Sequence, residues 1–93
     1  MSDTNGNRWV KADYFPDERD QKALQKDFQF KNFADALKFT IEIGKLAEKA
    51  NHHPDINLGW GYVRVWLTSH SEHKITTKDH DLAAKIDHIQ VHD

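Results

Sequence analysis

The feature of this sequence that most constrains its fold is the alternation of apolar and polar residues between Gly59 and His70. Side chains of a β-strand point alternately to its two faces, so the alternation predicts a strand with one fully apolar face. Val63, Val65 and Leu67 make up that face. A single strand cannot shield these residues from water, and the rest of the chain must therefore supply a sheet and a covering layer.

The opposite face of this strand is more aromatic than exposure to water alone requires. Its residues are Tyr62, Arg64, Trp66, Thr68 and His70. We expect this face to contact a second subunit or a ligand, because monomeric proteins seldom expose a large apolar patch.

Two segments with helical periodicity can supply the covering layer. Residues 33–50 follow Asn32, a good N-cap, and carry apolar residues at three- and four-residue spacing. The expected buried stripe is Phe33, Ala36, Leu37, Thr40, Ile41, Gly44 and Ala47, with Ile43 and Leu46 beside it. Gly44 in this stripe predicts close packing of the helix on the sheet, and Pro54 predicts that the helix ends near Asn51.

The second helix is expected to begin after Thr76, with Asp79 at its third position, where an acidic side chain interacts favourably with the helix dipole. Its apolar stripe is Leu82, Ala83, Ile86 and Ile89. The stripe recurs at three- and four-residue spacing, so this helix too should pack on the sheet.

Further strands are expected on both sides of the first helix. Residues 22–31 have a period of two, interrupted by Lys26. The apolar face of that strand is Leu24, Phe28 and Phe30. Residues 8–15 are consistent with a short strand or an irregular edge, residues 16–17 with a turn, and residues 56–61 leave room for another strand.

The order of these elements predicts an α+β fold with two layers, an antiparallel four-stranded sheet with helices packed on one face. The chain has 93 residues, enough for one core only. We expect residues 1–7 to form a flexible tail and residues 8–93 a single domain. A core of this size is thin, so we also expect a homo-oligomer.

Composition excludes several classes of function. The chain has 13 Lys and Arg against 15 Asp and Glu, so it lacks the basic surface of a protein that binds nucleic acid directly. It has no cysteine, which excludes disulfides, thiolate catalysis and cysteine zinc sites. We find neither an apolar run long enough to cross a membrane nor the pattern of a signal peptide. We expect a cytoplasmic protein, with the nucleus as an alternative.

Histidine is over-represented, with seven residues. His52 and His53 follow the first helix and His70 ends the main strand, so the three can converge although they lie far apart in the sequence. Glu48 lies four residues before His52, and the two can meet on one helix face if the helix continues. Histidines beside an acid suit general acid–base catalysis. The alternatives are purely structural histidines, or a weak metal-binding pair of His70 and His73.

Residues 48–54, Glu-Lys-Ala-Asn-His-His-Pro, followed by Trp60, His70 and Asp79, resemble the signature of the pterin-4a-carbinolamine dehydratase family. Three flanking segments also resemble the family pattern: Phe28–Phe33, Leu67–His70 and Thr76–Ala83. The resemblance covers roughly residues 9–90.

The resemblance implies a saddle-like antiparallel sheet with helices on one face, assembled as a homodimer or homotetramer. It implies an enzyme that removes water from 4a-hydroxytetrahydrobiopterin to give quinonoid dihydropterin, with a pterin as substrate and no metal or organic cofactor. The implied catalytic residues are His52, His53 and His70. The implied substrate-binding or supporting residues are Glu48, Ser69, Asp79 and Trp60.

Two other functions remain open. Animal members of this family also act as dimerisation cofactors of a homeodomain transcription factor through a helix surface, so a protein-binding module is the alternative. A noncatalytic pterin-binding scaffold would require inert histidines.

The sequence departs from the family pattern in two places. His73 and Lys74 stand where the family usually has two glycines. A residue other than glycine with positive φ costs roughly 1 kcal/mol, so we expect the loop between His70 and Thr76 to follow another path. Too few residues precede Trp9 for the N-terminal helix usual in the family, which affects the expected oligomer contacts.

Overall fold

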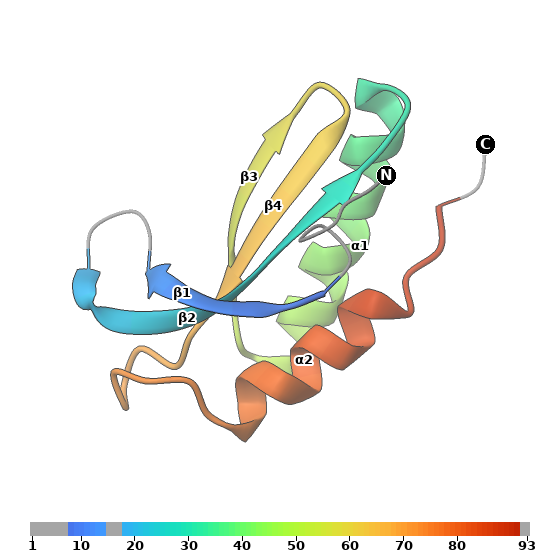
Figure 1. The fold of residues 1–93 in the computed structure, drawn as a ribbon. Coiled ribbons are helices and arrows are strands. Elements are labelled where there is room, and N and C mark those ends of the chain that lie inside the picture. Colours follow the sequence, from blue (N-terminus) through green and yellow to red (C-terminus); the bar gives the residue numbers. More distant parts are fainter. Residues whose placement is uncertain (1–7, 15–17, 92–93) are drawn as a thin grey trace.

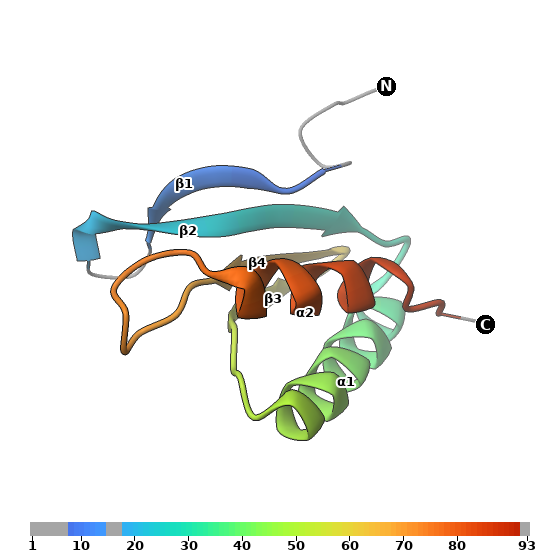
Figure 2. The ribbon, with the colours of Figure 1, turned by 90° about the horizontal axis from the view of Figure 1, so that it is seen from below.

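The computed structural model describes residues 8–14 and 18–91, with backbone alone for residues 18–20. The elements are β1 (Val10–Tyr14), β2 (Glu18–Gln29), α1 (Phe33–Ala50), β3 (Asp55–Gly59), β4 (Tyr62–Leu67) and α2 (Thr77–Asp87). The strands form one antiparallel sheet in the order β1-β2-β4-β3, and both helices cover the same face of it (Figures 1 and 2). The expected two-layer α+β fold is therefore confirmed. The expected tail at residues 1–7 and the turn at residues 16–17 lie outside the described residues.

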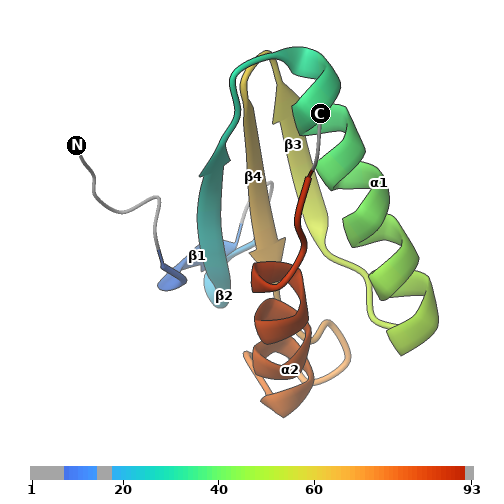
Figure 3. The same cartoon turned by 90° about the vertical axis from the view of Figure 1, so that its right-hand side faces the viewer.

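The segment from Gly59 to His70 is not one continuous strand. It contains a tight turn in which Gly61 has a φ of 78°, a value that glycine adopts without steric cost. β3 precedes this turn and is the additional strand expected near residues 56–61. β4 then runs antiparallel to both β3 and β2. Figure 3 shows β3 and β4 side by side, with α1 next to β3.

The helix-facing side of the sheet is the one expected from the sequence. Val63, Val65 and Leu67 are completely buried in a core that both helices share. Lys26, which interrupts the apolar face of β2, pairs with Asp87 of α2 at 2.8 Å and lies over the Phe28 ring. The end of α2 thus compensates for a charge at a position that would otherwise be apolar.

The buried side of α1 differs from the expected stripe. The helix buries Ala36, Phe39, Ile43 and Ala47 against the sheet. Phe33, Leu37 and Ile41 are 40–51% exposed, and apart from the helix's own nearby backbone no atom lies within 4 Å of the position that a Cβ on Gly44 would occupy. The predicted close packing at Gly44 is therefore wrong. Because α1 carries two neighbouring apolar stripes, periodicity alone could not decide which of them meets the sheet.

The other face of the sheet is partly buried within the chain itself. Trp66 packs with Tyr14 and Ala23 in a second small cluster. Thr68 is also buried, and its hydroxyl accepts a hydrogen bond from Gln21 at 2.8 Å. Trp66 and Thr68 therefore offer little surface to a subunit or ligand, whereas Tyr62 on the same face is 36% exposed, and a contact of this face stays a prediction. Neither α1 nor α2 has a long enough apolar stretch to cross a membrane.

Candidate active site

The end of α1 directs the histidine motif towards the sheet. Asn51 caps the helix in the left-handed conformation, with a φ of 53°. The backbone N–H of His52 donates to the carbonyl of Ala47 at 3.1 Å, which closes the last turn. The chain then leaves the helix through Pro54 and enters β3. The predicted end of the helix near Asn51 is confirmed.

A pocket of about 400 Å³ lies between this loop and the loop that joins β4 to α2. We call it the histidine pocket; its lining is Asn51, His52, His53, Pro54, Asp55, Ser69, His70, Ser71, Glu72 and Lys78. The three histidines that were expected to converge therefore lie around one cavity. A hydrogen bond from the Ser71 hydroxyl holds the pKa of Glu72 below its usual value, so this rim residue is negatively charged at neutral pH.

His52 is bound to the buried carboxylate of Asp79. Its Nε2 lies 2.5 Å from Asp79 Oδ1. The other oxygen of Asp79 accepts the Ser69 hydroxyl and the Thr76 backbone N–H, each at 2.8 Å. An ionised carboxylate can only accept hydrogen bonds, so it selects the tautomer of His52 with the hydrogen on Nε2. Nδ1 of His52 is then the ring nitrogen that can accept a proton.

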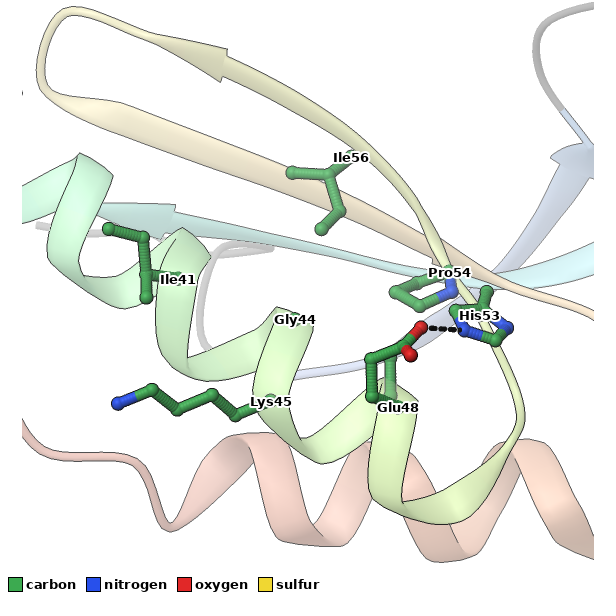
Figure 4. A pocket seen from close by; sticks show the side chains of 8 residues that line it. Ile41, Gly44, Lys45, Glu48, His53, Pro54 and Ile56 are labelled. Atoms are coloured by element: carbon green, nitrogen blue, oxygen red, sulfur yellow. Dashed lines mark hydrogen bonds and ion pairs between the residues drawn. The ribbon is translucent and has the colours of Figure 1, made fainter.

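His53, and not His52, is the partner of Glu48. Its Nε2 lies 2.6 Å from Glu48 Oε2, and both side chains are largely exposed. The predicted contact between Glu48 and His52 is wrong because the left-handed Asn51 ends the helix, so His52 no longer follows the helical spacing. Figure 4 shows Glu48 and His53 facing each other at the edge of a groove beside α1.

His70 contacts Tyr14, and Tyr14 in turn contacts Asp55; neither residue was identified from the sequence. His70 Nε2 lies 3.4 Å from the Tyr14 hydroxyl, which also lies 2.5 Å from Asp55 Oδ2. The Tyr14 and His70 rings meet edge to face, with centroids 5.3 Å apart. Asp55 directly follows the His-His-Pro motif, so its place in the sequence could have identified it as a site residue. Tyr14 is 56 residues from His70, and only the pairing of β1 with β2 brings it into reach.

The remaining predicted site residues divide between two ends of the sheet. Ser69 lies in the histidine pocket, and Asp79 lies behind His52. Trp60 is at the tip of the β3–β4 turn, 70% exposed, and lines a different pocket with Tyr62 and Arg64. The structure therefore does not bring Trp60 to the histidines of its own chain.

The loop after His70 keeps a left-handed residue although it has no glycine. His73 has a φ of 57°, so the expected alternative path is wrong. Backbone hydrogen bonds between Ser69 and Lys74 close the loop, and the His73 N–H donates to the His70 carbonyl at 3.3 Å. His73 Nδ1 also lies 3.4 Å from Gln21 Oε1. A loop that closes between Ser69 and Lys74 requires a residue with positive φ, and His73 is that residue.

His73 lines a pocket with Lys74 and His80, whereas His70 lines the histidine pocket. Among the described side chains, those of residues 8–14 and 21–91, no group of three or more histidine, aspartate or glutamate residues is arranged to hold a metal ion.

A family model described as pterin 4 alpha carbinolamine dehydratase matches residues 3–89. A protein of Alkaliphilus metalliredigens is 46% identical over 67 residues, which are 72% of this chain and 60% of the relative. A protein of Roseiflexus sp. is 42% identical over 71 residues, 76% of each chain. Both are provisionally named pterin-4-alpha-carbinolamine dehydratase. The chain spans about three fifths of the Alkaliphilus relative.

Two solved structures have a similar fold. One, from Brucella melitensis, is described as a transcriptional coactivator/pterin dehydratase; its TM-score is 0.75 at 32% identity, over 87% of this chain and 80% of that chain. The other is a pterin dehydratase-like protein described as a RuBisCO assembly factor in the α-carboxysome, with a TM-score of 0.70 at 24% identity over 90% of each chain. At 24% identity, the similarity to the second structure shows a shared fold and nothing more. Because the family model matches residues 3–89 of the 93-residue chain, the chain belongs to the pterin 4 alpha carbinolamine dehydratase family.

Proposed function

We propose that this chain is a 4a-hydroxytetrahydrobiopterin dehydratase that acts by histidine general acid–base catalysis. The observation that carries the proposal is the histidine pocket, in which three imidazoles surround one cavity. Each ring has its Nε2 beside an oxygen of another side chain. Membership of the family supports the choice of a pterin as substrate.

The reaction involves no oxidation or reduction, so the catalytic groups have to supply only proton transfers. The C4a–O bond breaks and the oxygen leaves as water, while the N5–H bond gives its electron pair to a new C4a=N5 double bond and its proton to a base. One group must therefore protonate the leaving oxygen and another must accept the N5 proton. Imidazoles, with an ordinary pKa of about 6.5, can do both at neutral pH, and each such transfer contributes roughly 10²–10⁴-fold.

The proposed catalytic residues are His52, His53 and His70, without a division into acid and base. Asp79 and Ser69 would hold His52, and Glu48 would hold His53, as their hydrogen bonds suggest. A volume of about 400 Å³ falls in the range of small-molecule sites. Trp60 is left out of the proposed site because it lines another pocket.

The experiment that tests this function follows the loss of chemically generated 4a-carbinolamine by absorbance. The purified chain should accelerate the loss over buffer and over the heat-unfolded protein. Equal rates in all three samples would contradict the proposal.

A second candidate function is a protein-binding module, and one observation favours it. Phe33, Leu37 and Ile41 form an exposed apolar stripe on α1. We propose this stripe as the place where a second copy, in a homodimer or homotetramer, or another protein would bind. A chain that shows no dehydratase activity but assembles through α1 would favour the binding module over the enzyme.

A further inference from the structure

The Tyr14 hydroxyl lies between two residues of the histidine pocket that come from different strands. Tyr14 ends β1, Asp55 begins β3 and His70 follows β4. The phenol oxygen is 2.5 Å from Asp55 Oδ2 and 3.4 Å from His70 Nε2. One hydroxyl group thus connects a carboxylate with an imidazole proposed to be catalytic.

The single proton of the phenol sets the direction of both hydrogen bonds. An ionised carboxylate only accepts, so the contact with Asp55 uses the Tyr14 proton. The Tyr14 oxygen then offers His70 only a lone pair. Nε2 of His70 must carry a hydrogen and donate it, which leaves Nδ1 as the ring nitrogen that can accept a proton.

The phenol is held in place independently of His70. Tyr14 is only 8% exposed and packs with Ala23 and Trp66. Asp55 pairs with Trp66 across the sheet, so its backbone belongs to the ladder. A group fixed by packing and by the sheet can orient a neighbouring ring without losing much conformational entropy of its own.

We propose that Tyr14 and Asp55 are positioning residues that hold His70 as the Nε2–H tautomer, so that Nδ1 is the atom through which His70 exchanges protons. The part that proton exchange at Nδ1 plays in dehydration rests on the proposed function. The assignment of the His70 tautomer does not depend on it. His52 and His53 also have Nε2 beside an oxygen, which in their case belongs directly to the carboxylate of Asp79 or Glu48.

The tautomer is measured directly by ¹⁵N NMR of the histidine rings at about pH 8.5, where ordinary imidazoles are neutral. The His70→Ala variant assigns the His70 signals by their absence. Wild-type His70 should be predominantly Nε2–H. Tyr14→Phe keeps the ring but removes the acceptor, so both tautomers should become populated. Asp55→Ala frees the phenol proton for Nε2, so Nδ1–H should predominate.

Tyr62→Phe is the matched control, because Tyr62 is the other tyrosine of the chain and lies in another pocket. It should leave the His70 signals unchanged. A wild-type His70 that is predominantly Nδ1–H, or an unchanged tautomer ratio in either Tyr14→Phe or Asp55→Ala, would overturn the inference. If Tyr14→Phe does not fold, as judged by circular dichroism, Asp55→Ala alone decides.

The activity arm uses the dehydratase assay on the same variants. Tyr14→Phe should lower kcat about tenfold with KM changed less than about twofold, whereas Tyr62→Phe should change neither. An inactive wild-type chain would refute the proposed function and leave the tautomer result to decide this inference. An active wild type with an unchanged kcat in Tyr14→Phe would overturn the positioning role.

Discussion

Asp79 serves both the fold and the candidate site. Its carboxylate is fully buried and accepts hydrogen bonds from Ser69, from the Thr76 backbone and from His52. It therefore starts α2, ties the β4–α2 loop to the helix and fixes a histidine ring. Glu48 has the same chemical group and also contacts a histidine, but it lies in water on the surface of α1.

This difference gives a matched prediction at the residue scale. Asp79→Asn should lower the free energy of unfolding by about 1–3 kcal/mol, because a buried acceptor is replaced by an amide that also needs acceptors. Glu48→Gln should change it by less than about 0.5 kcal/mol, since exposed ion pairs contribute little. Urea denaturation measures both values. Equal losses in the two variants would show that burial of Asp79 is not what matters.

Some residues of the candidate site could be predicted from the sequence and others could not. The three histidines could be predicted to converge because they follow the ends of two elements. The hydrogen bond between His52 and Asp79 could not be predicted, since it depends on how α2 packs beside the end of α1. Tyr14 could not be predicted either, because its place is set by strand register rather than by a motif.

At the scale of elements, the sequence predicts where α1 begins and ends but not which of its sides is buried. Its length and both ends follow from Asn32, Asn51 and Pro54, and these were predicted correctly. Its orientation was not, because a helix with two apolar stripes can turn either one to a sheet. The buried side was settled by Phe39 and Ile43, whose fit against β4 and β2 is a tertiary property.

Two glycines give a prediction for these elements. Gly44→Ala should stabilise the chain by about 0.5–1 kcal/mol, because alanine is the better helix former and nothing fills the space that its Cβ would take. Gly61→Ala should destabilise it by at least about 1 kcal/mol, because Gly61 has a φ of 78° and its Cβ would lie 3.1 Å from the Phe30 carbonyl. Thermal unfolding separates the two. A loss of stability in Gly44→Ala would mean that another surface packs there.

The loop after β4 gives a second prediction at this scale. The double variant His73→Gly/Lys74→Gly restores the glycines usual in the family at a position that already has positive φ. It should change kcat/KM by less than about fivefold, because neither side chain lines the histidine pocket. The dehydratase assay on this variant checks it. A larger change in either direction would add these residues to the site.

At the scale of the whole molecule, the exposed large apolar side chains of the described residues form two groups, one on α1 and one, Trp60 and Tyr62, at the β3–β4 turn. Phe33, Leu37 and Ile41 are exposed, whereas Trp66 is buried by its own chain. The expected homo-oligomer therefore has a more specific candidate surface than the sequence offered.

We predict that light scattering at micromolar concentration gives the mass of a dimer or a tetramer. Leu37→Glu/Ile41→Glu should reduce that mass, because it places charges in the proposed contact. Gln25→Glu, on the other face of the sheet, is the control and should not. A monomeric wild-type chain would contradict the prediction, and so would an oligomer that the α1 variant leaves intact.

The most direct test of the proposed function is the turnover of His52→Ala and His70→Ala in the 4a-carbinolamine assay. Each variant should lose at least about tenfold in kcat while remaining folded, because each lacks a proton-transfer group of the pocket. His80→Ala is the control, since His80 is exposed on α2 and lines another pocket; its kcat should stay within about twofold of wild type. Near-wild-type turnover in both His52→Ala and His70→Ala would contradict histidine acid–base catalysis in this pocket.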